Sequence, residues 1–243
     1  MPIAIIIVIV LALIFDFLNG FHDSANIVAT VISSRAMAPR RVLLMTAIAH
    51  FIGPFLFGVA VATTIGSEVV QEDAVTLLVV AAALIAAIAW NLITWFFGIP
   101  SSSSHALVGG IVGAVLVQSG WDALRMDGLR KVLTALLVSP LLGLAVGYVL
   151  MKMVMFLARG ASPRLNWFFK RGQWGTALWL GLSHGTNDAQ KTMGVITMAL
   201  LAGGVIGDFS VPTWVIAIRA GAIAIGTELG GWRLIMRLGG KFY

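Results

Sequence analysis

The chain has no cysteine and few charged residues, and both absences restrict what it can be. Its 243 residues include 16 basic and 10 acidic side chains. Charged residues therefore make up 11% of the chain, against about a quarter in soluble domains. Without cysteine there is no disulfide scaffold and no indication of the redox compartment. The G-X-Y repeat of collagen and the charge excess of disordered chains are also missing.

Hydrophobic residues, in contrast, make up 59% of the sequence, and the mean hydropathy is +0.99. A soluble domain of this size has too little interior to bury so much apolar surface. The alternating apolar pattern of transmembrane strands is absent. We therefore predict a polytopic membrane protein of the all-α class, a bundle of transmembrane helices.

Long stretches without charge predict the membrane-spanning helices. The longest holds 48 residues between Asp73 and Asp122. A bilayer core about 30 Å thick needs about 20 residues of helix, so this stretch has room for two crossings, folded near Gly98–His105. The predicted helical segments are 3–34, 42–66, 74–97, 99–118, 132–158, 174–204 and 211–232.

The basic residues predict the orientation. Segments 35–41, 152–171 and 233–241 contain 3, 5 and 3 of them. Because cytoplasmic loops are rich in Lys and Arg, we expect seven crossings of the inner or plasma membrane, with the N-terminus outside. No basic face with interleaved aromatics is present, so we expect no nucleic-acid partner.

Two of the predicted helices carry polar residues near their middle. The first contains NGFHDSAN at Asn19–Asn26, and the second contains LSHGTNDAQK at Leu182–Lys191. At an offset of 165 residues, Gly20–Asp23 aligns with Gly185–Asp188, and the two segments cross in opposite directions. This pattern predicts inverted-topology repeats whose broken helices carry a substrate site near the membrane midplane.

Asp23 and Asp188 are the central residues of these motifs. An aspartate at bilayer depth costs roughly 2.5–3.5 kcal/mol on insertion scales, so it needs a partner or a water-filled cavity. Each could simply cap a half-helix and bond the other's backbone. Two aspartates at matching positions, beside glycine and amide or imidazole groups, favour a functional site instead.

A third polar insertion, GIPSSSSH at Gly98–His105, precedes the apolar string ALVGGIVGA. Proline followed by serines and an apolar run is typical of a helix N-terminus. Free backbone N–H groups and hydroxyls at such a terminus can hold an oxyanion. The alternative is a serine-rich turn whose hydroxyls only satisfy the helix cap.

Together, the three strings resemble the inorganic phosphate transporter (PiT) family, of the bacterial low-affinity type. That family has two copies of a pattern near G-x-N-D-x-x-N, each followed by G-x-P-x-S-[TS]-[TS]-H. The resemblance covers nearly the whole chain. It implies a homodimeric carrier in the membrane lipid, not an enzyme, that moves phosphate or metal–phosphate inward with sodium ions or protons. No cofactor or resident metal is implied, and a divalent metal would enter only with phosphate.

The resemblance also implies the residues of the site. The phosphate-binding residues are Asp23, Asn26, Ser102, Ser103, Ser104, Asp188 and Lys191. The coupling-ion residues are His22, Asp23, Asn26, Asn187 and Asp188. His22 and Lys191 replace the asparagines of many members, which removes amide oxygens and favours proton over sodium coupling.

The end of the chain departs from the family pattern. At the same offset, the second hydroxyl cluster would fall near 265–270, beyond Tyr243. We therefore expect a C-terminally incomplete carrier: a truncated transporter, a proteolytic portion of one, or one piece of a split protein that a separate C-terminal portion completes. The expected division is a first repeat at 1–158, a cytoplasmic basic loop at 159–173 and the start of the second repeat at 174–243.

Three other functions remain open. A permease for sulfate or another oxyanion would use similar groups, and a non-transporting fragment of a split carrier would lack the second cluster. An intramembrane hydrolase would need a nucleophile, a base and an oxyanion hole, and no G-x-S-x-G is present.

Several single residues carry weaker expectations. His50 and His184 are expected to form interhelical hydrogen bonds, and His105 to order the serine turn. Arg219 and Glu228 are expected to pair with each other or with the absent segment.

Overall fold

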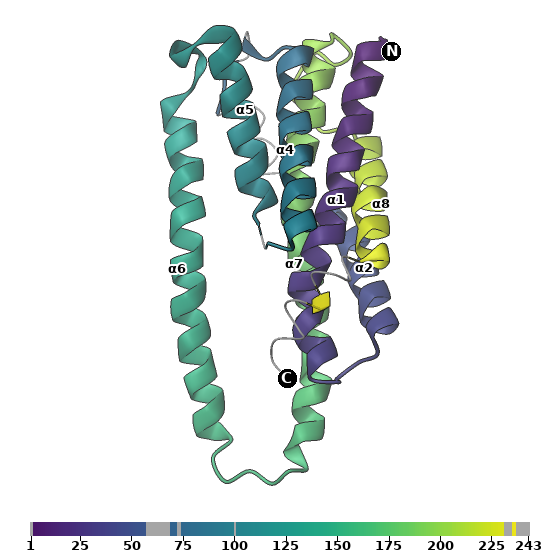
Figure 1. The fold of residues 1–243 in the computed structure, drawn as a ribbon, viewed down its shortest axis with the longest axis vertical. Helices are drawn as coiled ribbons and strands as arrows, with labels where there is room; N and C mark the ends of the chain where they lie inside the picture. The colour runs from purple at the N-terminus through teal and green to yellow at the C-terminus, as the bar shows by residue number, and fades with distance from the viewer. Residues whose placement is uncertain (1, 57–68, 72–73, 100, 231–234, 237–243) are drawn as a thin grey trace.

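A computed structural model describes residues 2–56, 69–71, 74–99, 101–230 and 235–236, most of which are helical. The elements are α1 (Ile3–Ser33), α2 (Pro39–Leu56), α4 (Leu77–Phe97), α5 (Ser103–Ser119), the short 3-10 helix η3 (Trp121–Ala123), α6 (Met126–Leu157), α7 (Leu165–Ala202) and α8 (Thr213–Leu229). The helices lie along one long axis (Figure 1). The predicted all-α class is confirmed.

The outer surface is apolar. Helices α1, α4 and α6 are each long and apolar enough to cross a membrane. Along α6, large side chains such as Leu137, Leu141 and Tyr148 are exposed, and only Gly128 is buried. Apolar groups in such density on a helix surface are stable in lipid and not in water, as expected for a membrane protein.

Four helices form the centre of the bundle. α1 packs along α8 and runs in the same direction, while α2 packs along α7 and both run the opposite way (Figure 1). Glycines permit this close packing: a Cβ at Gly20 would overlap Ile223 on α8, and a Cβ at Gly185 would overlap His50 on α2. Small residues at such contacts allow helix backbones to touch, which is how helices associate in membranes.

Helices α4 and α5 form a hairpin that contains the serine motif. α4 ends at Gly98, whose φ of 62° is the left-handed cap that glycine adopts readily. α5 begins after Ser102, whose hydroxyl accepts a hydrogen bond from the His105 backbone N–H at 3.3 Å. The lower ends of α4 and α5 lie near the middle of α1 (Figure 1). Here the Trp95 and Phe21 rings pack edge to face with their centroids 6.0 Å apart. The serine motif therefore lies within the bundle instead of reaching the end of α1.

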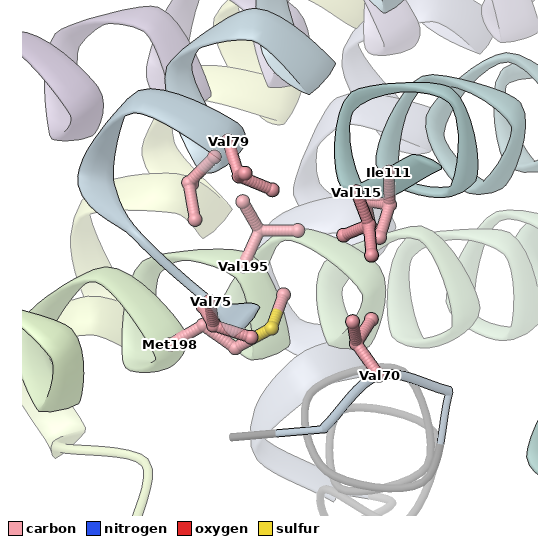
Figure 2. A pocket seen from close by; sticks show the side chains of 8 residues that line it. Val70, Val75, Val79, Ile111, Val115, Val195 and Met198 are labelled. Atoms are coloured by element: carbon pink, nitrogen blue, oxygen red, sulfur yellow. The ribbon is translucent and has the colours of Figure 1, made fainter. Parts of the chain in front are cut away.

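The hairpin packs on α7 through apolar side chains. A cavity of about 10 Å³ lies between them, lined by residues that include Val79, Ile111, Val195 and Met198 (Figure 2). All of its lining residues are apolar, and an anion or water needs polar partners. A substrate site must therefore lie elsewhere.

The predicted breaks in the two polar helices are wrong. α1 and α7 continue as helices through both motifs. Within the motifs, the Ser24 hydroxyl donates to the Phe21 carbonyl at 3.0 Å and the Thr186 hydroxyl donates to the Leu182 carbonyl at 2.7 Å. Because these groups bond within their own helices, the backbone does not need to open.

One predicted boundary also differs, and another lies outside the described residues. α7 begins at Leu165, so most of the predicted loop at 159–173 is helical. Tryptophan and arginine side chains stack on one another along this helical start, with Arg171 over the rings of Trp167 and Trp174 at 5.0 and 4.8 Å. The predicted helix at 42–66 ends within residues 57–68, which lie outside the described residues.

Candidate functional site

Asp23 of α1 and Asp188 of α7 lie side by side in the centre of the bundle. Both are buried, and ligand atoms of Asp23, Asp188 and His184 all lie within 4.8 Å of one another. Helix α1 packs against α7 over this region, so the two motifs that the sequence aligns meet in space.

On α7, Asp188 is held between two nitrogen donors. Lys191 Nζ lies 2.5 Å from Asp188 Oδ1, and His184 Nδ1 lies 3.2 Å from Oδ2. The three residues share one helix face, because residues three and four apart are neighbours on a helix. Lys191 is only 4% exposed, so its charge is balanced by the carboxylate and not by water. We refer to His184, Asp188 and Lys191 as the α7 triad.

On α1, the surroundings of Asp23 are different. The Asn26 side-chain amide donates to Asp23 Oδ1 at 3.4 Å. Within the described residues, no lysine or arginine nitrogen lies within 4.0 Å of the Asp23 carboxylate. Asn19, one turn earlier on the same face, is 1% exposed, and neither of its side-chain amide atoms has a partner among the described groups. We refer to Asn19, Asp23 and Asn26 as the α1 triad.

A buried ion pair lies one turn beyond this site. Arg219 of α8 donates from Nε and Nη2 to the two oxygens of Asp16, each at 3.0 Å, and the Thr192 hydroxyl donates to the same carboxylate at 2.6 Å. Arg219 Nη2 also donates to the Asp188 carbonyl at 3.3 Å. The expectation that Arg219 pairs with Glu228 or with an absent segment is therefore wrong.

Sequence reasoning missed Asp16 and Asn19. The signal for Asp16 was present, since it is the first charged residue after a long apolar run at the N-terminus. A charge in such a run needs a partner inside the bundle. Nothing in one sequence indicates that this partner is Arg219.

The histidines beside the site have separate roles. His50 Nδ1 and Thr227 Oγ1 lie 2.7 Å apart and join α2 to α8, which confirms the expected interhelical hydrogen bond. His184 instead contacts Asp188 on its own helix, so the same expectation for His184 is wrong. The His50 and His184 rings lie 6.4 Å apart.

Several predicted site residues lie away from the two aspartates. His22 is buried beside the backbone of Asn91 on α4, and Asn187 is exposed. The serines form the start of α5: Ser102 is its cap, Ser103 is buried and Ser104 is half-buried. Among the described residues, no hydrogen bond joins these three serines to Asp23 or Asp188.

The arrangement places groups for an anion beside groups for a cation. An ammonium and an imidazole N–H can donate to an oxyanion, whereas carboxylate and amide oxygens can only accept from donors or bind cations. Asp23, His184 and Asp188 are also close enough for one divalent ion to reach all three. Such an ion would compete with Lys191 for Asp188.

Comparison with known proteins identifies relatives over most of the chain. A family model described as "Phosphate transporter family" matches residues 19–167 and 158–243. A Bacillus subtilis protein named "Probable low-affinity inorganic phosphate transporter" is 44% identical over 242 residues, covering 97% of this chain and 72% of that protein. A Mycobacterium leprae protein of the same name is 47% identical over 239 residues, covering 97% of this chain and 58% of the relative.

The fold also resembles a solved structure. The structure titled "The sodium-dependent phosphate transporter" matches with a TM-score of 0.80 and 21% identity, covering 99% of this chain and 78% of that one. At this identity the likeness concerns the fold alone. The matches in sequence extend over both polar motifs and the serine hairpin, and on these grounds the chain belongs to the phosphate transporter family.

Proposed function

We propose that the chain takes up inorganic phosphate, or a metal–phosphate complex, as an inward secondary transporter coupled to sodium ions or protons. The observation that supports this most strongly is the pair of buried aspartates at matching positions of α1 and α7, only one of which has a lysine. Two aspartates with only a structural role would have no need for different neighbouring side chains.

The charges of the site explain why transport would be coupled. Phosphate near neutral pH is a mixture of mono- and dianion, so two carboxylates repel it. Lys191 offsets the charge of Asp188, but no such fixed charge contacts Asp23 in the part of the chain that the structure describes. A sodium ion or a proton at Asp23 would therefore be needed before phosphate enters, because an uncompensated charge is costly in a dry site.

Phosphate itself would bind to the donor groups. Lys191 and His184 can donate to its oxygens from α7, and the hydroxyls of Ser102–Ser104 and the first N–H groups of α5 can do so from the hairpin. Asn26 and Asn187, which are both exposed, would contribute amide groups. His22 is buried beside α4, so it would not be a direct ligand of the coupling ion. It would affect the ion only by fixing the position of the α1 backbone beside Asp23.

Alternating access would arise from inverted repeats, the first at 1–158 and the second beginning at 174. The glycine contacts support this proposal. Gly20 packs on α8 and Gly185 packs on α2, while Gly226 packs back on α1 and Gly53 packs back on α7. The α1–α8 pair and the α7–α2 pair therefore have matching glycine contacts, as two repeats of one structural unit would.

The carrier would lie in the cell membrane with its N-terminus outside. The basic segments 35–41 and 158–171 lie at one end of the bundle and the N-terminus lies at the other (Figure 1), as cytoplasmic loops rich in Lys and Arg require. We further propose a homodimer.

A permease for another oxyanion is the second candidate, because Lys191 and serine hydroxyls suit any tetrahedral anion. Sulfate, however, cannot donate a proton near pH 7, whereas phosphate can donate one to a carboxylate of the site. Phosphate is therefore the better substrate for a site with two aspartates.

Uptake of radiolabelled phosphate into vesicles that contain the chain tests the proposal. We expect uptake that a tenfold excess of sulfate leaves unchanged and that Lys191→Met abolishes, while Lys152→Met, on the exposed surface of α6, retains it. Inhibition by sulfate as strong as by unlabelled phosphate would favour the second candidate. If the vesicles show no uptake and the purified chain binds no phosphate, the proposed function is wrong.

A further inference from the structure

The start of α7 carries a stacked arginine at one end of the bundle. The Arg171 guanidinium lies over the rings of Trp167 and Trp174, at 5.0 and 4.8 Å from their centroids. Trp174 is fixed in turn, because its Nε1–H donates to the Ala36 carbonyl at 2.8 Å. The stack therefore joins α7 to the loop between α1 and α2, where the exposed Arg35 directly precedes Ala36.

No acidic side chain of these segments neutralises the two arginines. Residues 24–67 and 128–187 contain neither Asp nor Glu. Among the residues that the structure describes, neither Arg35 nor Arg171 forms an ion pair. Contrary to the expectation from the sequence, a small basic face with aromatic neighbours is therefore present.

Stacking leaves the N–H groups of Arg171 available to a ligand. The aromatic rings cover the faces of the guanidinium, whereas its N–H groups lie in its plane. Within the described part of the chain, no hydrogen bond uses these groups. A guanidinium can donate two parallel hydrogen bonds to a phosphate, and such charge-assisted pairs are strong. Arg171 is therefore held in place without a carboxylate and can bind phosphate oxygens.

Both arginines lie at the depth of the lipid headgroups. Arg35 follows Asp23 by 12 residues, which is about 18 Å along a helix axis. Arg171 precedes Asp188 by 17 residues, or about 26 Å. With the aspartates near the midplane, as the repeat pattern predicts, headgroups lie about 15–22 Å away. Helix tilt shortens the depth of Arg171, and a long arginine side chain reaches back to the phosphates.

We propose that Arg171 and Arg35, linked through Trp174, bind the headgroup phosphate of an anionic phospholipid in the leaflet at this end of the bundle. In the proposed orientation this is the inner leaflet, whose negative surface attracts basic segments. A lipid fits better than free phosphate, because tryptophan rings at headgroup depth pack against lipid while their N–H groups are satisfied. This surface is separate from the buried aspartates, so the inference does not depend on phosphate transport.

Lipid binding to the purified full chain in detergent, measured by native mass spectrometry, tests the proposal. The probes are phosphatidylglycerol and phosphatidylcholine with identical acyl chains. We expect the wild type to bind phosphatidylglycerol more tightly. Arg171→Gln should weaken the binding of phosphatidylglycerol about fivefold, since each basic residue near an anionic surface contributes about that factor. Binding of phosphatidylcholine should stay unchanged.

Two further variants separate a local site from a general effect of charge. Arg130→Gln is the matched control, because it removes an exposed arginine from the start of α6, at the opposite end of the bundle (Figure 1). It should bind phosphatidylglycerol as the wild type does. Trp167→Leu changes no charge but removes one ring of the stack, so it should weaken this binding by a smaller factor. All three side chains are exposed, so the variants should keep the wild-type melting temperature.

Several results would overturn the proposal. They are equal binding of the two lipids by the wild type, unchanged binding of phosphatidylglycerol by Arg171→Gln, and an equal loss in Arg130→Gln. Displacement of bound phosphatidylglycerol by excess inorganic phosphate or by a single-stranded oligonucleotide would also overturn it. In that case the surface would recognise a different phosphate-containing partner.

Discussion

The polar motifs of α1 and α7 have the same spacing but opposite electrical character. Asp188 lies 2.5 Å from a lysine ammonium and 3.2 Å from an imidazole. Asp23 receives a hydrogen bond from an amide at 3.4 Å. The comparison indicates how one repeated helix motif can serve an anion and a cation at once, since the two carboxylates lie next to each other while their other neighbours differ.

A second difference concerns how α1 and α7 are fixed to their partner helices. α1 is joined to α8 by the Asp16–Arg219 ion pair. At the matching position α7 has Gly181, which packs against Thr46 and Ala49 of α2. The α1–α8 contact therefore combines close packing with a buried ion pair, whereas no ion pair among the described residues joins α2 to α7.

The largest expected effect comes from breaking the ion pair. Arg219→Met would leave the Asp16 carboxylate buried without its cation, which costs about 3–5 kcal/mol. We expect a corresponding loss in the free energy of unfolding, measured by denaturation in detergent. The double variant Asp16→Leu/Arg219→Met should recover most of it. Wild-type stability of the single variant would show that the pair does not hold α1 to α8.

Removing the lysine of the α7 triad should weaken phosphate binding. A hydrogen bond to a charged group contributes about 1.5–3 kcal/mol, so Lys191→Met should raise the Kd for phosphate about 10–100-fold. Titration of the purified protein with labelled phosphate measures this. Asn26→Leu, at the matching position of α1, should chiefly shift the cation response, so equal loss of phosphate affinity in both variants would argue against separate roles.

Alanine substitution at the glycine contacts should lower the free energy of unfolding equally in both pairs of helices. A methyl group at Gly20 or Gly185 would overlap the neighbouring helix, so each change to alanine should lower the free energy of unfolding by about 1–3 kcal/mol. Gly175→Ala is the matched control, because open space surrounds that position and alanine favours a helix. A loss at only one of the two glycines would contradict the matching of α1 with α7.

The smallest effect is expected at the contact between α2 and α8. Thr227→Val removes the hydroxyl that lies 2.7 Å from His50 Nδ1. A single hydrogen bond contributes about 0.5–1.5 kcal/mol, so the melting temperature should fall slightly while phosphate binding remains. Loss of phosphate binding in this variant would mean that His50 belongs to the site.

The sequence predicted the helical class and the meeting of Asp23 with Asp188, because charge-free runs and repeated motifs are local patterns. It did not predict that α1 and α7 stay continuous, since polar side chains of the motifs bond within their own helices, as Asp188 does with His184 and Lys191. Arg219 is 203 residues from Asp16 along the chain, a pairing that helix periodicity cannot indicate. The isolation of Asn19 is likewise visible only once α4, α7 and α8 surround α1.

The central claim is that the cation binds at Asp23 and the phosphate beside Asp188. The most direct test measures phosphate affinity of the purified chain as a function of NaCl concentration and pH, in the wild type and in Asp23→Asn. We predict that phosphate affinity of the wild type rises with the cation, and that Asp23→Asn removes this dependence. An Asp23→Asn protein whose phosphate affinity keeps the wild-type dependence on NaCl and pH would contradict the account.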